Sequence, residues 1–259
     1  MHAAQRDAEI TRLLQSEGFV SFRYLCERLD ASSATIRRDL ERLDAEGRIE
    51  RVRGGARLKG GEGGVEAERL VGAPFEQNRV RHAAQKAAIG RAAAALCGPG
   101  EAIILDGGTT TFQMCGHLDG LNLQVLTNSL HIVGAMLPQP GTRISVPGGA
   151  VYREQNIILS PFDDDGISRY HASKLFMGAA AIGPRGLMQA DVVLIQAEQK
   201  LMDKAERLIV LADSSKFRAS APFLVCDLDQ IDVLITDTGA RPEDVEMLRA
   251  RDVEVIVAG

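Results

Sequence analysis

The 259-residue sequence lacks tryptophan and contains only eleven phenylalanine and tyrosine residues. Because the bases of single-stranded nucleic acids stack on aromatic side chains, this composition disfavours a single-strand-binding protein. Cysteine is also scarce: Cys26, Cys97, Cys115 and Cys226 are widely spaced and form no Cys-x-x-Cys pair. We therefore predict buried thiols, and neither a disulfide framework nor a zinc site.

Long apolar runs are absent as well. The longest stretch without a charged residue, 120–142, includes two prolines and several polar side chains, so it cannot form a membrane-spanning helix. The N-terminal segment carries Arg6, Asp7, Glu9 and Arg12 where a secretory signal peptide needs an uninterrupted apolar core. The sequence therefore predicts a cytoplasmic protein without a membrane partner.

The net charge of −5 would by itself argue against a nucleic-acid partner, but it is unevenly distributed. Residues 1–60 hold 12 lysines and arginines against 10 acidic residues, a balance of +2, whereas residues 61–259 hold 18 against 25, a balance of −7. The acidity therefore belongs to the larger, C-terminal part. The length fits two unequal domains or one large α/β domain.

Residues 1–60 show the pattern of three short helices followed by a hairpin. Apolar residues recur at helical spacing in each helix, as with Ile36, Leu40 and Leu43 in the third. Segment 48–58 then alternates apolar and charged residues around Gly54 and Gly55, which is typical of two strands joined by a turn. This combination predicts a winged helix-turn-helix domain over residues 1–60.

Four of the five residues 60–64 are glycine, which predicts a linker, placed at 61–77. A long helix is expected over 79–96. Beyond it, helix-length segments separate most of a series of short apolar runs, at 102–105, 123–126, 143–146, 174–177, 208–211, 233–236 and 253–257. Continuous apolar strands alternating with amphipathic helices are typical of a parallel sheet covered on both faces, so residues 78–259 predict a doubly wound α/β domain.

The start of the third predicted helix carries side chains suited to reading DNA. Small polar residues stand at its N-terminus, and arginines follow one turn later, away from its apolar stripe. In the major groove an arginine fork can bind O6 and N7 of guanine, while arginines of the wing can meet flanking phosphates. The candidate DNA-binding residues are Ser32, Ser33, Thr35, Arg37, Arg38, Arg42, Arg51 and Arg53. The alternative is a winged helix that contacts proteins, with these arginines as ordinary surface charges.

A second candidate site follows the first predicted strand of the large domain, in the run Asp106-Gly-Gly-Thr-Thr-Thr111. Two glycines allow close backbone approach, and threonine hydroxyls at a helix N-terminus favour an anion such as a phosphate. The run is neither a Walker A loop nor a Gly-x-Gly-x-x-Gly dinucleotide fingerprint. The alternative is structural: threonines that cap a helix after a tight turn.

Other polar or glycine-containing loops follow the later strands. In open α/β sheets ligands bind outside the carboxyl ends of the strands, so these loops should line one crevice. Glu198 and Lys200 stand two residues apart on a predicted helix and face about 200° apart, so we favour Glu198 alone as facing a ligand. The candidate effector-binding residues are Asp106, Gly107, Gly108, Thr109, Thr110, Thr111, Asn128, Gly148, Gly149, Gly178, Glu198 and Lys216, the last as a counter-charge for phosphate.

Both sets of residues resemble a known family. Segments 32–40 and 51–56 look like the N-terminal signature of the DeoR family of bacterial regulators of sugar catabolism. Segments 105–111, 126–129, 148–149, 177–178, 186–187 and 212–216 look like its sensor domain. The resemblance implies a Rossmann-like sensor domain, similar to ribose-5-phosphate isomerase, glucosamine-phosphate deaminase and CoA transferases.

The resemblance also implies a function: a repressor that binds double-stranded operator DNA and responds to a phosphorylated sugar effector. Because operator symmetry usually mirrors protein symmetry, a homo-oligomer, dimer or tetramer, is expected. Segments 159–161 and 196–200 depart from the commonest family pattern. They resemble the branch that contains the ascorbate-utilisation repressor.

The other function considered is a sugar-phosphate isomerase or deaminase that carries a DNA-binding module. Such chemistry needs a positioned acid and base, but the five histidines are scattered and none is adjacent to an acidic residue. The run Asp163-Asp164-Asp165 could bind a metal, yet three adjacent acids are more typical of a solvated turn. We therefore predict no catalytic residues, no metal and no cofactor.

Overall fold

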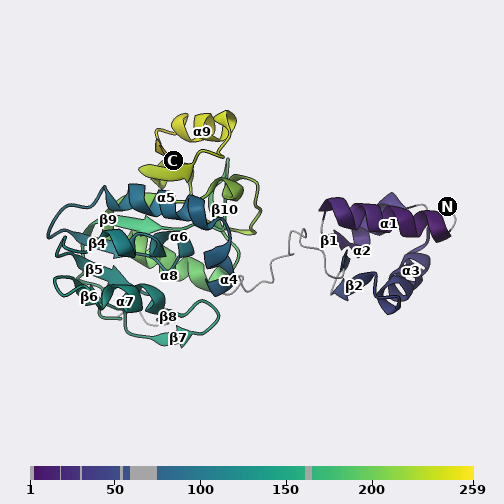
Figure 1. Cartoon of the computed structure of the whole chain (residues 1–259), viewed down its shortest axis with the longest axis horizontal. Coiled ribbons are helices and arrows are strands. Elements are labelled where there is room, and N and C mark those ends of the chain that lie inside the picture. Colours follow the sequence, from purple (N-terminus) through teal and green to yellow (C-terminus); the bar gives the residue numbers. More distant parts are fainter. Residues whose placement is uncertain (1–2, 18, 30, 53–54, 59–74, 161–164) are drawn as a thin grey trace. The chain divides into compact units, whose positions relative to one another are not determined.

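The computed structural model (Figure 1) describes residues 3–17, 19–29, 31–52, 55–58, 75–160 and 165–259. The chain forms two compact units, Met1–Arg69 and Leu70–Gly259. Within the described residues, no helix is both long enough and apolar enough to cross a membrane. All four cysteines are free thiols; Cys115 and Cys226 are buried as predicted, whereas Cys26 and Cys97 are only partly so.

The N-terminal unit contains the three predicted helices and the predicted hairpin. Its elements are α1 (Ala3–Glu17), β1 (Phe19–Ser21), α2 (Phe22–Arg28), α3 (Ser33–Ala45), β2 (Ile49–Val52) and β3 (Gly55–Leu58). Strand β1 was not predicted; it pairs antiparallel with β3 and extends the wing to three strands in the order β1-β3-β2. Ile10 and Leu14 of α1 and Ile36 and Leu43 of α3 are fully buried and form the core.

Local sequence explains where α3 begins and how it is held. The side chain of Ser32 caps the helix by accepting a hydrogen bond from the Thr35 backbone N–H at 3.2 Å. In the second turn, Asp39 is buried, and its Oδ2 accepts a hydrogen bond from Arg6 Nε at 2.7 Å. This ion pair joins α1 to α3, so the orientation of α3 depends on a charge pair as well as on apolar packing.

The C-terminal unit is built on a seven-stranded parallel sheet in the order β15-β14-β12-β9-β4-β5-β6. The strands are β4 (Ala102–Leu105), β5 (Gln124–Thr127), β6 (Arg143–Ser145), β9 (Ala172–Met177), β12 (Ala205–Leu211), β14 (Val233–Asp237) and β15 (Glu254–Ala258). Each overlaps one of the seven predicted apolar runs. The chain builds the sheet outward in one direction from β4 and then in the other from β9, so the topological switch point lies between these two strands.

Helices cover both faces of this sheet, as a doubly wound domain requires (Figure 1). Successive strand residues point to opposite faces. Ile103 and Leu105 of β4 therefore pack in the core beneath α5 (Ala83–Ala94) and α7 (Leu130–Met136). Ile104, between them, packs on the other side with α8 (Val192–Met202) and α9 (Pro242–Arg249). The predicted fold class is confirmed.

Several smaller elements surround the sheet. They are the hairpin β7 (Ala150–Tyr152) and β8 (Ile157–Leu159), the antiparallel sheet of β10 (Ala181–Gly183), β11 (Gly186–Gln189) and β13 (Phe223–Cys226), the short helices α4 (Phe75–Val80) and α6 (Thr109–Phe112), and the 3-10 turns η1 (Cys115–His117), η2 (Ser214–Phe217) and η3 (Leu228–Gln230).

The single helix expected over 79–96 is wrong. His82 has a φ of 52°, in the left-handed region, and this residue separates α4 from α5. Helix α4 begins at Phe75, so residues 75–77, which were expected at the end of the linker, form its first turn. The ring of Phe75 is almost completely buried in the C-terminal unit.

Candidate functional site

The outer face of α3 carries Arg37 and Arg38, both exposed. Among the described residues, no carboxylate pairs with either of them. The guanidinium of Arg37 lies 5.6 Å from the centre of the Phe22 ring, a cation–π distance that steadies the side chain without neutralising it. The N-terminal half of α3 therefore presents two positive charges to solvent.

The other described candidates on the N-terminal unit are already engaged. Arg42 Nη2 lies 2.7 Å from Asp7 Oδ1, and its Nη1 lies 3.3 Å from Glu46 Oε1. Arg51 Nη1 lies 3.2 Å from Glu41 Oε1. Arg53 lies outside the described residues. Arg42 and Arg51 would have to share or exchange these acidic partners in order to contact DNA.

The small polar residues at the start of α3 hold the helix end. Ser32 Oγ lies 2.8 Å from Thr35 Oγ1 and also caps the helix. Ser33, the first helical residue, is exposed. Asp39 does not reach the exposed face of α3, because it is buried and paired with Arg6.

In the C-terminal unit, the carboxyl ends of β4 and β9 meet at the switch point. A Cβ on Gly108 would stand 3.6 Å from Gly178 Cα, so the two loops are in backbone contact. The carboxylate of Asp106 accepts hydrogen bonds from the backbone N–H groups of Gly107 and Gly178 and from the Asn128 side chain. The structure thus brings together three of the predicted loops around one buried acid.

The threonine run is more structural than predicted. Helix α6 is a single turn, so its dipole contributes little to anion binding. Thr111 Oγ1 lies 2.7 Å from the carbonyl oxygens of both Asp106 and Gly108, and the side chain is fully buried. Thr110 is also buried. Any anion at this loop would depend on backbone N–H groups and on nearby cations.

A second acid lies near Asp106. Glu198 of α8 is 5% exposed, and Gln189 Nε2 donates a hydrogen bond to its Oε1 at 2.5 Å. Burial, together with the negative charge of Asp106, raises the pKa of Glu198 well above its ordinary value. Burial also raises the pKa of Asp106, against the lowering effect of its hydrogen-bond donors. The two acids therefore favour holding a proton.

Cations gather two strands away, at the end of β12. Lys86, in the first turn of α5, is 4% exposed and donates to the backbone carbonyl of Asn78 in α4. Burial lowers its pKa to about 8; nearby Asp213 opposes that shift, whereas Lys216 adds to it. Lys216 was predicted, but Lys86 was missed. The only sequence signal was a lysine on the apolar face of an alanine-rich helix.

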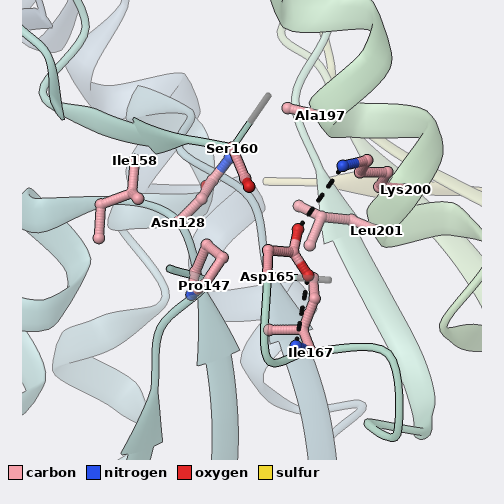
Figure 2. Close-up of a pocket in the computed structure, with 9 residues that line it drawn as sticks. All are labelled: Asn128, Pro147, Ile158, Ser160, Asp165, Ile167, Ala197, Lys200 and Leu201. Carbon is pink, nitrogen blue, oxygen red and sulfur yellow. Dashed lines mark hydrogen bonds and ion pairs between the residues drawn. The ribbon is translucent and has the colours of Figure 1, made fainter. Parts of the chain in front are cut away.

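A pocket opens beyond Asn128 (Figure 2). Asn128, Pro147 and Ile158 line one side, and Ala197, Lys200 and Leu201 of α8 line the other, with Ser160, Asp165 and Ile167 completing it. Lys200 Nζ lies 3.7 Å from Asp165 Oδ2. Lys200, which was set aside in favour of Glu198, therefore lines the pocket, whereas Glu198 is not among the lining residues. Asp163 and Asp164 lie outside the described residues.

Gly148 and Gly149 follow Pro147, which lines this pocket. The Gly148 N–H donates to the Asp165 carbonyl at 2.7 Å. A Cβ on Gly149 would stand 2.3 Å from the Leu159 carbonyl oxygen, so only glycine fits there. Both residues shape the loop that carries Pro147.

Comparison with known proteins defines the class. Residues 6–60 match the DeoR-like helix-turn-helix domain, and residues 81–238 match the DeoR C-terminal sensor domain. The chain belongs to the DeoR family. It is 32% identical over 256 residues to the HTH-type transcriptional regulator UlaR of Shigella dysenteriae serotype 1 and, over the same length, to UlaR of Escherichia coli strain K12 / DH10B, covering 99% of each chain in both cases.

The solved structures that the chain matches are more distant. The full-length sorbitol operon regulator SorC from Klebsiella pneumoniae is 10% identical, with a TM-score of 0.39, over 96% of this chain and 99% of that one. Ribose 5-phosphate isomerase A from Methanocaldococcus jannaschii is 16% identical, with a TM-score of 0.38, over 51% of this chain and 52% of that one.

The buried acid Glu198 predicts a pH-dependent stability. Because the pKa of Glu198 is raised in the folded state, the folded protein keeps a proton that the unfolded chain loses. The contribution of Glu198 to the free energy of unfolding is therefore present below the ordinary glutamate pKa and declines as the pH rises towards the folded pKa. Glu198→Gln should therefore gain in melting temperature relative to wild type between pH 5 and pH 8, by about 2–4 °C for each kcal/mol involved. Exposed Glu206→Gln is the control, and an equal gain in both variants would contradict the assignment.

Proposed function

We propose that this protein is a transcriptional repressor of a carbohydrate-catabolism operon, whose affinity for operator DNA is changed by a phosphorylated sugar bound in the sensor unit. The observation that carries the proposal is the charge arrangement at the two sites. Arg37 and Arg38 of α3 are exposed and have no acidic partner among the described residues. They belong to the DeoR-like helix-turn-helix domain, residues 6–60, which is termed the reader. Along the carboxyl edge of the sheet, Lys86 and Lys216 stand beside buried Asp213 at the end of β12, and Asp106 and Glu198 are buried two strands away.

Regulation, not catalysis, is supported by what surrounds the crevice. The UlaR relatives that match the whole chain are transcriptional regulators. His131 stacks on Phe75 with 3.7 Å between ring centres, and its Nε2 lies 3.1 Å from Asn156 Nδ2. His171 pairs with Glu206 at the opposite edge of the sheet. Neither histidine forms an acid–base pair beside Asp106.

The reader would place the N-terminal half of α3 in the major groove. There, Arg37 or Arg38 can take a guanine edge, while Ser33 approaches a phosphate. One such helix makes few contacts, so a homo-oligomer that presents two of them to half-sites about 34 Å apart is the assembly we propose. A protein acting on operator DNA works in the cytoplasm of a bacterial cell.

The effector would lie along the carboxyl edge of the sheet. Strands β12 and β4 are separated by β9, so their ends lie about 10 Å apart. This span suits a sugar phosphate with its phosphate beside Lys86 and Lys216 and its sugar beside Asp106 and Asn128. We favour that orientation because Lys86 and Lys216 supply positive charge at the end of β12.

Helix α4 is the element suited to transmit a conformational change from the effector site to the reader. It is the first element described after the predicted linker. Its Phe75 ring contacts Phe112 of α6 edge-on at 5.6 Å and stacks on His131 of α7. Its Asn78 carbonyl accepts from Lys86. Movement of any of these three partners on ligand binding would reposition α4.

Substitution of an unpaired arginine should weaken operator binding. Arg38→Ala should lose about 5–150-fold in affinity for an operator selected from random duplexes with the wild-type protein, because a guanine contact contributes about 1–3 kcal/mol. Arg48→Ala removes the same charge from a side chain near Glu46 and should change affinity little. Equal losses on operator and random DNA would mark Arg38 as a phosphate contact instead.

Loss of the buried lysine should abolish effector binding. Lys86→Met should remove the thermal stabilisation produced by inorganic phosphate and by a panel of pentose and hexose phosphates. In wild type, ligand affinity should fall between pH 7 and pH 9, as Lys86 loses its proton near its pKa of about 8. Lys204→Met is the matched control. Ligand binding retained by Lys86→Met would contradict the phosphate position.

A substitution in helix α4 should separate ligand binding from the ligand-induced change in operator affinity. Phe75→Leu keeps an apolar side chain but loses the ring stack, so ligand should still bind while the ligand-induced change in operator affinity, about 5–150-fold for a typical switch, shrinks towards none. Phe223→Leu, on β13, should respond as wild type does. The coupling role is wrong if Phe75→Leu retains the full response in an operator titration with and without ligand.

A further inference from the structure

Strand β15 forms one edge of the seven-stranded sheet, where it pairs in parallel with β14. Glu254 donates its backbone N–H to the Asp232 carbonyl at 3.0 Å, on the side of β14. Because the backbone groups of successive strand residues point to opposite sides, those of Val255 and Val257 point away from the sheet. Within the described residues, no hydrogen-bond partner meets this outer side. The N–H and C=O groups of both valines are therefore open to pairing with another strand.

The two edges of this sheet are treated differently by the sequence. Natural sheets usually protect a free edge with a short strand, a charge or a proline, because an open edge recruits other chains. Strand β6, at the opposite edge, is three residues long, begins with Arg143 and is followed two residues later by Pro147. Segment 253–258 reads Val-Glu-Val-Ile-Val-Ala, with one charged residue and no proline. Such a segment favours pairing with another strand.

Helices cover β15 on both faces, so a partner strand would approach along its edge. Val255 belongs to the core cluster that contains Leu248 of α9, and Ile256 belongs to the cluster that contains Ile89 of α5. Val255 and Ile256 are nevertheless only partly buried, and Val257 is 47% exposed. Both apolar layers therefore reach the edge and stop there. A second sheet with the same layers would continue them.

A second copy of this chain fits the edge because β15 is complementary to itself. When two copies are related by a two-fold axis, the two strands run antiparallel, and Val255 of one copy can lie opposite Val257 of the other. In this register each Val255–Val257 combination is a hydrogen-bonded pair, so the N–H and C=O groups of both valines are satisfied in both copies. The contact closes at two copies, because each copy uses the same edge.

The charges near the edge are compatible with this arrangement. Glu243 and Glu246 are exposed in the first half of α9, and Arg249 is exposed in its last turn. The two-fold axis makes the two α9 helices antiparallel, so the acidic start of one faces the basic end of the other. Glu254 lies opposite Ala258 in the proposed register and about 13 Å along the strand from its own equivalent. At that distance salt screens the repulsion.

We propose that two copies of this chain associate by antiparallel pairing of their β15 strands, with Val255 opposite Val257, so that their seven-stranded sheets join into one. The inference deepens the proposed function, on whose homo-oligomer it rests, by naming the surface at which two copies meet. The contact involves the C-terminal unit alone, so it should form without DNA.

Substitution of Val257 should weaken the association. Val257→Pro removes an N–H that β14 does not use, and thus two of the hydrogen bonds between the copies. The dissociation constant should rise about 30-fold or more in sedimentation velocity of the full-length protein. Val257→Lys, which places a charge against the partner sheet, should weaken association as well. Val146→Lys is the matched control: Val146 follows β6, is 45% exposed, and its variant should associate as wild type does.

A disulfide reports the register. In the proposed register Ile256 lies opposite its own equivalent in a non-hydrogen-bonded pair, with Cα atoms about 4.5 Å apart, which a disulfide can span. Ile256→Cys should therefore give a covalent dimer on oxidation with copper phenanthroline, seen on a non-reducing gel. Glu254→Cys, about 13 Å from its equivalent, should not. Wild type, with its four free thiols, gives the background.

The outcomes separate this inference from the proposed function. An oligomer that resists both Val257 substitutions and forms no covalent dimer through Ile256→Cys would overturn the inference and leave the homo-oligomer standing. A covalent dimer through Glu254→Cys but not through Ile256→Cys would overturn the register. A wild-type protein that stays monomeric at every concentration, with and without operator DNA, would overturn the inference and the homo-oligomer together.

Discussion

The reversal of strand order between β4 and β9 is the constraint on which the sensor unit depends. The chain winds outward in both directions from these two central strands, so the loops that follow them leave towards opposite sides. The backbones of these two loops are in contact at Gly108 and Gly178. Every polar group at issue lies along the same carboxyl edge. Asp213, Asp106 and Asn128 follow β12, β4 and β5, and the first turn of α5 brings Lys86 to that edge.

At both sites, burial and ion pairing decide which side chains carry an available charge. In the reader, acids of α1 and α3 engage Arg6 and Arg42, which leaves the positive field of α3 concentrated at Arg37 and Arg38. At the carboxyl edge of the sheet, burial pushes Lys86 towards its neutral form and Glu198 towards its protonated form.

Much of the fold could be predicted from the sequence because its signals are local. The seven apolar runs predicted the seven strands of the sheet, and small polar residues predicted the start of α3, where Ser32 is the cap. Strand β1 could not be predicted, because three residues carry no period and pair only with the distant β3. The break at His82 could not be predicted either, since neither glycine nor proline marks it and the left-handed φ arises where α4 packs back through Phe75.

The sequence by itself determined the two-part organisation, the reader's helices, the parallel sheet and the loops that meet at its carboxyl edge, because each follows from periodicity or from short-range turn chemistry. Only the tertiary structure decided which charges are available. It paired Arg42 and Arg51 with acids, left Arg37 and Arg38 to solvent, buried Lys86 beside Asp213, buried Glu198 near Asp106, and paired Lys200 with Asp165. Whether a charge is paired or buried depends on residues distant in the chain, which sequence spacing does not specify.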